Sequence, residues 1–250
     1  MYIKQTHSTS TLLREQYSDT LPHLYTIRTD FQTAGRGQAG NSWESEAGKN
    51  LLFSALLKYD GIHATKQWRL SMLVSVALWE TLAKYLSPEL LTIKWPNDIY
   101  FEDKKLVGIL IENNLSGQYM GYSIVGIGVN VNQNQWLNNA PNPVSMKEIT
   151  GEEYNAEVLM NEWITSMKSW ELRTTEDIKA TYLHHLYRRN GWHEYLEREV
   201  SITPTAIAQK GVENSFMAQI TNITEQGELV LRLQNNEEKT YHFKQIRFVI

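Results

Sequence analysis

The glycine-rich segment AGRGQAGNSWES, residues 34–45, limits the folds that are open to this chain. Its glycines match the pattern G-x-G-x-x-G of dinucleotide-binding proteins, and Asp60 follows 20 residues after Gly40. That motif requires a helix that begins at its third glycine, because the pyrophosphate of the dinucleotide lies at the helix N-terminus. The residues after Gly40, NSWESEAGKN, show no apolar repeat with helical spacing. We therefore expect a ligand-binding loop, and an oxidoreductase with a doubly wound fold becomes a distant alternative.

Apolar patterns in the rest of the chain predict an α+β fold, in which a mixed sheet packs with helices that do not alternate strictly with strands. The expected strands cover residues 24–29, 51–57, 90–95, 99–101, 105–112 and 122–131. The expected helices cover residues 10–17, 65–86, 156–172 and 176–189, with Thr65 as the cap of the second and Asn190-Gly191 as the end of the fourth. The charged turn at residues 102–104 predicts an antiparallel hairpin.

The pattern changes near Glu199, where short strand-like runs such as SFMAQITNI and GELVLRL begin and helical patterns stop. The first of these expected strands is EVSITP, residues 199–204. We therefore expect a main domain over residues 1–195 and a small all-β domain over residues 196–250.

Composition excludes several kinds of site. The 250 residues contain no cysteine, which excludes disulfides, thiolate zinc sites and cysteine nucleophiles. Histidine motifs such as H-E-x-x-H are absent from the sequence, and we predict no metal site built from side chains. A net charge of −4 and an isoelectric point near 6.0 argue against a nucleic-acid partner. Signal-peptide and membrane-spanning patterns are also absent from the sequence, so we expect a cytoplasmic protein without a membrane partner.

The segment KWPND, residues 94–98, places polar side chains on a rigid corner. Pro96 has a fixed φ and biases Trp95 toward extended backbone. Asn97 and Asp98 therefore follow a strand in a defined geometry, in which they can select a ligand.

Two further segments combine glycines with polar residues. Lys105 begins the strand KLVGILIE, in which Gly108 lets a ligand approach the backbone. In GIGVNVN, residues 126–132, glycines again clear space, and the amide of Asn130 can donate and accept hydrogen bonds. Each fragment alone has an ordinary structural interpretation, such as a bulge, a turn or a solvated lysine. Their combination and order are far more specific.

In this order the segments resemble those of biotin protein ligases (biotin–[acetyl-CoA-carboxylase] ligases). The family pattern contains a Ser-Thr-Asn stretch, GRGRxGRxW, KWPND, K-[LA]-x-G-I-L-x-E and GIGxNxN. This chain has Ser8-Thr9-Ser10, GRGQAGNSW, KWPND, KLVGILIE and GIGVNVN. The resemblance implies the class II synthetase-like biotin–lipoate ligase fold, followed by a C-terminal barrel of the Src-homology-3 type. Because the Ser-Thr stretch begins at residue 8, we expect the monofunctional type without a DNA-binding extension and without a repressor role.

The resemblance also implies a two-step reaction. Biotin and ATP would form biotinyl-5′-AMP, and biotin would then be transferred to a lysine of a biotin carboxyl carrier protein domain. ATP and Mg²⁺ are the expected cofactors, biotin is the substrate, and the chain could function as a homodimer. Both steps bring anions together or develop negative charge, so catalysis should depend on positioning and on cations.

Three side chains have expected roles in this chemistry. The guanidinium of Arg36 can bind the phosphate, with backbone N–H groups from Gly35 to Gly40 as an anion nest. Trp43 offers a flat surface for the adenine or for closing the loop. Lys105 is the expected cation that polarises the biotin carboxyl and the adenylate carbonyl.

The resemblance extends the predicted site to further residues. Ser8, Thr9, Ser10 and Gln32 are expected to hydrogen-bond the ureido ring of biotin, and Asn130 to bind the adenine. The predicted catalytic residues are Lys105 and Arg36. The predicted biotin-binding residues are Ser8, Thr9, Ser10, Gln32, Arg36, Gly37, Gln38, Lys105 and Gly108. The predicted nucleotide-binding residues are Gly35, Arg36, Gly37, Trp43, Asn97 and Asn130.

This chain departs from the family pattern at three positions. Gln38 and Asn41 replace arginines of the loop, and Ser10 replaces the asparagine after Ser-Thr. These changes concern retention of the adenylate more than the type of reaction. Two alternatives stay open: a lipoate–protein ligase of the same fold, and a non-catalytic biotin- or adenylate-binding protein. Retention of both Arg36 and Lys105 favours a catalyst.

Overall fold

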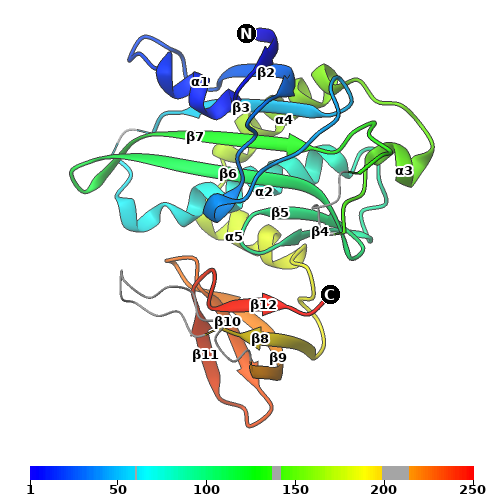
Figure 1. Ribbon diagram of the computed structural model, residues 1–250. Coiled ribbons are helices and arrows are strands. Elements are labelled where there is room, and N and C mark those ends of the chain that lie inside the picture. The colour runs from blue at the N-terminus through cyan, green and yellow to red at the C-terminus, as the bar shows by residue number, and fades with distance from the viewer. Residues whose placement is uncertain (60, 137–141, 199–213) are drawn as a thin grey trace.

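The computed structural model describes residues 1–59, 61–136, 142–198 and 214–250 (Figure 1). Asp60 and the strand expected at residues 199–204 lie outside the described residues. Within the described part, the predicted α+β class is confirmed, with one mixed sheet and one antiparallel sheet.

A seven-stranded sheet organises the larger unit, in the order β1-β2-β3-β7-β6-β5-β4 (Figure 1). β1 and β2 are parallel, whereas every other neighbouring pair is antiparallel. The expected hairpin at residues 102–104 is confirmed, because β5 and β6 pair antiparallel around it. The strands are β1 (Tyr2–Thr6), β2 (Tyr25–Gln32), β3 (Leu51–Leu57), β4 (Leu91–Lys94), β5 (Asp98–Phe101), β6 (Lys104–Ser116) and β7 (Tyr119–Val129).

The predicted helices are present, but their ends differ from the expectation. The second begins after a 3₁₀ turn, η2 (Ala64–Lys66), so Thr65 is not its cap; instead His63 accepts a hydrogen bond from the Thr65 N–H at 3.3 Å. The fourth ends several residues before Asn190-Gly191. The helices are α1 (Thr9–Glu15), α2 (Trp68–Leu82), α3 (Met146–Thr150), α4 (Ala156–Glu171) and α5 (Thr175–His184).

Two apolar cores cover opposite faces of the sheet. Successive side chains of a strand point to opposite faces, and in β3 Phe53 and Leu57 pack in the large core with α2 and α4. Leu56, between them, packs with Leu13 of α1 in a small core on the other face. Both faces of β3 are therefore covered, which explains why its run LLFSALL is wholly buried.

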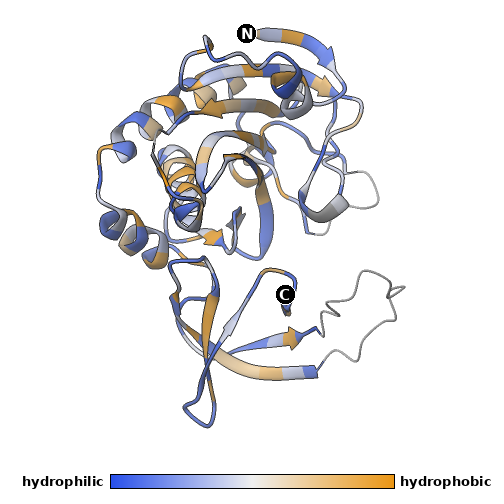
Figure 2. Ribbon diagram, turned by 90° about the vertical axis from the view of Figure 1, so that its left-hand side faces the viewer, coloured by the Kyte–Doolittle hydropathy of each residue, from blue (hydrophilic) through white to orange (hydrophobic). Residues whose placement is uncertain are grey.

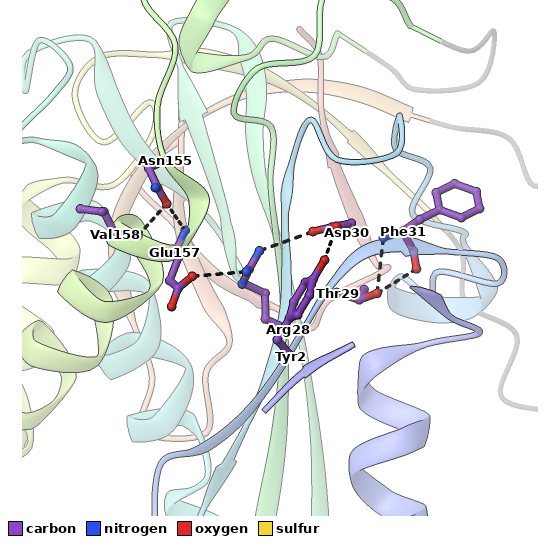
Figure 3. Close-up of polar contacts among 8 residues, drawn as sticks. All are labelled: Tyr2, Arg28, Thr29, Asp30, Phe31, Asn155, Glu157 and Val158. Carbon is purple, nitrogen blue, oxygen red and sulfur yellow. Dashed lines mark hydrogen bonds and ion pairs between the residues drawn. The ribbon is translucent and has the colours of Figure 1, made fainter. Parts of the chain in front are cut away.

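Polar contacts join the edge strand β1 to β2, and β2 to α4 (Figure 3). The Tyr2 hydroxyl donates to Asp30 at 2.5 Å, and the Arg28 guanidinium lies 4.6 Å from the centre of the Tyr2 ring. Arg28 also donates to Glu157 at 3.4 Å, in the first turn of α4, where Asn155 caps the backbone. These contacts stabilise a strand whose own side chains are mostly exposed.

A second unit contains a five-stranded antiparallel sheet, in the order β11-β10-β9-β8-β12, and lies below the first in Figures 1 and 2. It confirms the small all-β unit and is consistent with a domain of the Src-homology-3 type. β8 crosses the boundary proposed at residues 195 and 196, although its strand partners all belong to the second sheet. The strands are β8 (His193–Glu197), β9 (Asn214–Ile223), β10 (Leu229–Leu233), β11 (Glu238–Tyr241) and β12 (Ile246–Phe248).

The two units meet at a tight turn of the second sheet. The Trp95 indole N–H donates to the Gly227 carbonyl oxygen at 2.9 Å. Gly227 has a φ of +89°, and a methyl group at this position would lie 2.4 Å from the Trp68 ring, so glycine is required for both reasons. Trp95 of the KWPND segment thus connects the second unit to the main sheet.

In the described part of the chain, none of the helices is both long and apolar enough to cross a membrane.

Candidate active site

Three glycines form the floor of a cavity on the α1 face of the main sheet. Gly108 of β6 lies directly opposite Gly128 of β7, and Gly126 lies opposite Ser54 of β3. A methyl group at Gly108 or Gly128 would lie 2.5 or 2.4 Å from the Trp43 ring, and one at Gly126 would lie 2.6 Å from the Ser10 hydroxyl oxygen. The glycines are therefore needed for close approach of groups above the sheet.

The cavity has a volume of about 160 Å³ and brings together most of the predicted site. Gly35 and Asn130 do not line it. The predicted residues among its walls are Ser8, Thr9, Ser10, Gln32, Arg36, Gly37, Gln38, Trp43, Asn97, Lys105 and Gly108.

A neutral cluster is made by the lining residues Ser8, Thr9, Ser10 and Gln32, together with the fully buried Ser54, which bonds to two of them. The Ser54 hydroxyl lies 2.8 Å from that of Thr9 and 3.0 Å from that of Ser10. The Gln32 side-chain oxygen accepts from the backbone N–H of Thr9 at 2.8 Å and from its hydroxyl at 3.1 Å. Ser8 is buried, and its hydroxyl makes no hydrogen bond with the described residues. The cluster can therefore offer oriented donors and acceptors to a neutral polar group.

Residues 35–43 form a small hairpin around the 3₁₀ turn η1 (Gln38–Gly40). Gly37 N–H donates to the Asn41 carbonyl at 2.7 Å, and Trp43 N–H donates to the Gly35 carbonyl at 3.0 Å. The hairpin holds the Trp43 ring over the glycine floor, with its indole N–H buried and without a hydrogen-bond partner among the residues that the structure describes. A buried unpaired donor is costly, so this N–H is available to an acceptor atom of a ligand. The expected loop without a helix is confirmed.

Arg36 carries the positive charge of this hairpin, and Glu112 holds it. Its guanidinium donates two hydrogen bonds to the Glu112 carboxylate, at 2.6 and 3.3 Å. Arg14 of α1 lies 2.8 Å from the same carboxylate. Two cations therefore share one carboxylate at the rim, and Arg36 can move to another anion while Glu112 keeps a partner.

Lys105 is also paired with a carboxylate. Its ammonium lies 2.8 Å from the Asp98 carboxylate and 5.8 Å from the centre of the Trp43 ring. Lys105 and Asp98 stand on neighbouring strands, β6 and β5, beside the glycine floor. We refer to Arg36–Glu112 and Lys105–Asp98 as the two charged pairs: Glu112 also contacts Arg14 of α1, whereas Asp98 lies opposite Gly108 in the ladder.

The two predicted asparagines hold backbone in place. The Asn130 side-chain N–H donates to the backbone carbonyl of Lys105 at 3.3 Å. The Asn97 side-chain N–H donates to the carbonyl of Ile109 and the residue is buried in the cavity wall. Asn130 thus contacts the strand that carries Lys105, and its adenine contact stays a prediction.

Several residues that line the cavity or contact its walls were not predicted from the sequence. Ser54 could have been found as the single polar residue in the run LLFSALL. Glu112 is the last residue of the quoted segment KLVGILIE, but its partner Arg36 is distant in sequence. Lys94 and Phe243 also line the cavity, and Phe243 belongs to the loop between β11 and β12 of the second unit. Phe243 could not be predicted, because its place at the cavity depends on how the two units pack.

The chain matches the model of the biotin/lipoate A/B protein ligase family over residues 2–130. It is 30% identical over 212 residues to the biotin–[acetyl-CoA-carboxylase] ligase of Paracoccus denitrificans, covering 80% of this chain and 81% of that one. It is 36% identical over 126 residues to the bifunctional ligase/repressor BirA of Bacillus subtilis, covering 50% of this chain. That match spans only 38% of the length of the bifunctional relative.

Solved structures have the same fold. The biotin protein ligase of Aquifex aeolicus in complex with biotin and ATP aligns with a TM-score of 0.74 at 22% identity, covering 100% of this chain and 98% of that one. The biotin protein ligase of Leishmania major in complex with biotinyl-5-AMP aligns with a TM-score of 0.65 at 17% identity, covering 96% of this chain and 97% of that one.

Proposed function

The chain belongs to the biotin/lipoate A/B protein ligase family, and from this premise we propose that it is an ATP-dependent biotin–protein ligase. The observation that carries the proposal is a cavity in which a neutral hydrogen-bonding cluster and two cations flank one glycine floor. Biotin has a neutral ureido ring at one end and a carboxylate at the other, and these match the neutral cluster and the Lys105 ammonium beside the glycine floor.

The neutral cluster favours biotin over lipoate. A ureido ring supplies two N–H donors and a carbonyl acceptor to the hydroxyls of Ser8, Thr9 and Ser10 and to the amide of Gln32. The dithiolane ring of lipoate has neither strong donors nor strong acceptors, and it would leave these buried groups without new partners. Sites that are built to hydrogen-bond a ligand discriminate strongly against analogues that lack the bonding groups.

The two charged pairs would serve the first step. An oxygen of the biotin carboxylate attacks the α-phosphorus of ATP, the bond from this phosphorus to the bridging oxygen breaks, and pyrophosphate leaves with the electron pair. Lys105 would draw the biotin carboxylate and the α-phosphate together, and Arg36 would exchange Glu112 for the phosphate. Both cations act on charge that is concentrated at the reacting centre.

In the second step, the lysine amine of a biotin carboxyl carrier protein domain attacks the carbonyl carbon of the mixed anhydride. The bond to the AMP oxygen breaks, AMP leaves, and the nitrogen loses a proton. Lys105 would stabilise the negative charge on the carbonyl oxygen. Homodimer formation and the cytoplasmic location stay predictions.

Mg²⁺ is the proposed companion of ATP. Among the described residues, no group of three His, Asp or Glu side chains is placed to hold a metal ion. Mg²⁺ usually binds through substrate phosphates and one or two carboxylates while it keeps several waters, which fits the single carboxylate, Asp98, among the described lining residues. When bound, the ion would neutralise phosphate charge.

Exchange of labelled pyrophosphate into ATP tests the proposal, with biotin and lipoate compared in parallel. We expect exchange that requires biotin and, in a separate reaction with ATP, transfer of biotin to a carrier domain. Exchange that is stimulated by lipoate alone would show a lipoate ligase. Biotin or adenylate binding without exchange would show a non-catalytic binding protein.

A further inference from the structure

Lys94 extends the row of residues that forms the cavity floor. In the ladders, Gly128 of β7 lies opposite Gly108 of β6, Gly108 opposite Asp98 of β5, and Asp98 opposite Lys94 of β4. Directly opposed residues of neighbouring strands project on the same face of a sheet. Lys94 therefore projects on the cavity face and lines the cavity, two strands or about 10 Å beyond the glycine floor.

The Lys94 ammonium differs from the other two cations because a carboxylate does not hold it. It makes no hydrogen bond or ion pair within the part of the chain that the structure describes. Asp98, opposite it in the ladder, is bonded to Lys105 instead. The ammonium lies 4.9 Å from the centre of the Tyr100 ring and 5.0 Å from that of Phe248, which comes from the second unit.

These surroundings leave the positive charge incompletely compensated. Burial lowers the pKa of Lys94 below its usual range, and the positive charges of Lys105 and Arg188 act in the same direction, while Asp98 opposes them. Aromatic faces attract a cation but accept no ordinary hydrogen bond from it. A partly buried ammonium with three unused donors is a site for an anion.

The direction of the proposed reaction identifies this anion. The neutral cluster at α1 would hold the biotin ring, and Lys105 would hold its carboxylate beside the α-phosphate. In phosphoryl-type displacement the attacking and leaving oxygens are roughly in line through the phosphorus. The leaving group therefore extends away from the biotin ring, across β5 toward the edge strand β4.

We propose that Lys94 binds the β- and γ-phosphates of ATP and stabilises pyrophosphate as it leaves. This role rests on the proposed ligase function and concerns the first step alone, because biotinyl-5′-AMP lacks these phosphates. Lys105, in contrast, would serve both steps. Phe248 would help to hold the Lys94 ammonium, so the second unit would support the phosphate site.

The test compares Lys94→Met, which keeps the length of the side chain, with Lys94→Arg and with Lys104→Met. Lys104 is a neighbouring exposed lysine that does not line the cavity, so its variant should behave as the parent does. Three quantities are measured for each folded protein: pyrophosphate exchange as a function of ATP, binding of inorganic pyrophosphate by calorimetry, and transfer from synthetic biotinyl-5′-AMP to a carrier domain. Thermal unfolding provides the control for folding.

For Lys94→Met we expect a rise in KM for ATP and weaker pyrophosphate binding, each by about tenfold or more, because a charged hydrogen bond is lost. Transfer from synthetic adenylate should stay within about twofold of the parent rate, since a group without a contact in that step does not affect it. Lys94→Arg should restore most of the ATP dependence. Unchanged exchange and pyrophosphate binding in Lys94→Met would overturn the proposal, as would an equal loss in both steps. Absence of exchange in the parent protein would instead refute the ligase function itself.

Discussion

The neutral cluster and the two charged pairs are built on opposite principles. At the neutral cluster, Thr9, Gln32 and Ser54 hydrogen-bond one another and carry no charge. In the charged pairs, Arg36 and Lys105 are each held by a carboxylate. The neutral cluster is oriented before a ligand arrives, whereas each charged pair must exchange one anion for another.

This difference separates affinity from catalysis. Neutral groups that are already oriented bind a neutral ring with little rearrangement, so the cluster should set the affinity for biotin. Cations that are released from Glu112 and Asp98 act where the negative charge of the reaction develops, so the charged pairs should set the rate. Substitutions in the neutral cluster and in the charged pairs should therefore change different constants.

The largest effect is expected for Lys105→Ala. Removal of this cation should lower pyrophosphate exchange by about 10²- to 10⁴-fold, because it stabilises charge at the reacting centre. Biotin binding, measured by calorimetry, should change only a few-fold, by roughly 1 kcal/mol or less. Lys104→Ala is the matched control. Unchanged exchange in Lys105→Ala would remove this residue from the mechanism.

Arg36→Gly should loosen the adenylate. We expect biotinyl-5′-AMP to leave the protein about 10- to 100-fold faster, because a charged bidentate contact with its phosphate is lost. The measurement follows adenylate release into solution, with biotin affinity as the internal control. If the variant retains the adenylate as well as the parent does, Arg36 is not its phosphate ligand.

Gly126→Ala should affect the neutral cluster alone. Its methyl group would lie 2.6 Å from the Ser10 hydroxyl oxygen and would displace α1 or the cluster. We expect the Kd for biotin to rise by about tenfold, a cost of about 1.4 kcal/mol, with an unchanged KM for ATP. Gly121→Ala, in the same strand, is the control, because its nearest contact would be an ordinary 3.5 Å. Equal changes in the Kd for biotin and in the KM for ATP would contradict the separation between the neutral cluster and the charged pairs.

The smallest effect is expected for Glu112→Gln, and it has the opposite sign. Loss of the carboxylate charge leaves Arg36 without its competing anion, so the adenylate should leave about threefold more slowly. Release is measured as for the Arg36 variant. Faster release would show that Glu112 orients Arg36 toward the phosphate rather than competing with it.

Local patterns predicted the elements that have a clear apolar period. The buried run of β3 and the amphipathic residues of α2 and α4 were visible in this way. β1 was missed because its residues YIKQT are mostly exposed and show no apolar alternation. α3 was missed although Ser145 and Glu148 form a capping box, because its five residues are too few for a period.

The site was predictable to the extent that it lies in short segments. The glycine floor, Trp43 and Lys105 stand in motifs that can be read directly. The partners of the cations could not be predicted, because the contact between Arg36 and Glu112 depends on how a loop folds over a distant strand. The surroundings of Lys94 depend further on the packing of Phe248 from the second unit.

A crystal structure of the complex with biotinyl-5′-AMP tests the division of the cavity most directly. We predict that the ureido ring hydrogen-bonds the neutral cluster, that Arg36 and Lys105 contact the phosphate and carbonyl, and that Arg36 is separated from Glu112. This division of roles would be contradicted by a ligand in the reverse orientation. It would also be contradicted by an Arg36 that still holds Glu112 and makes no contact with the phosphate.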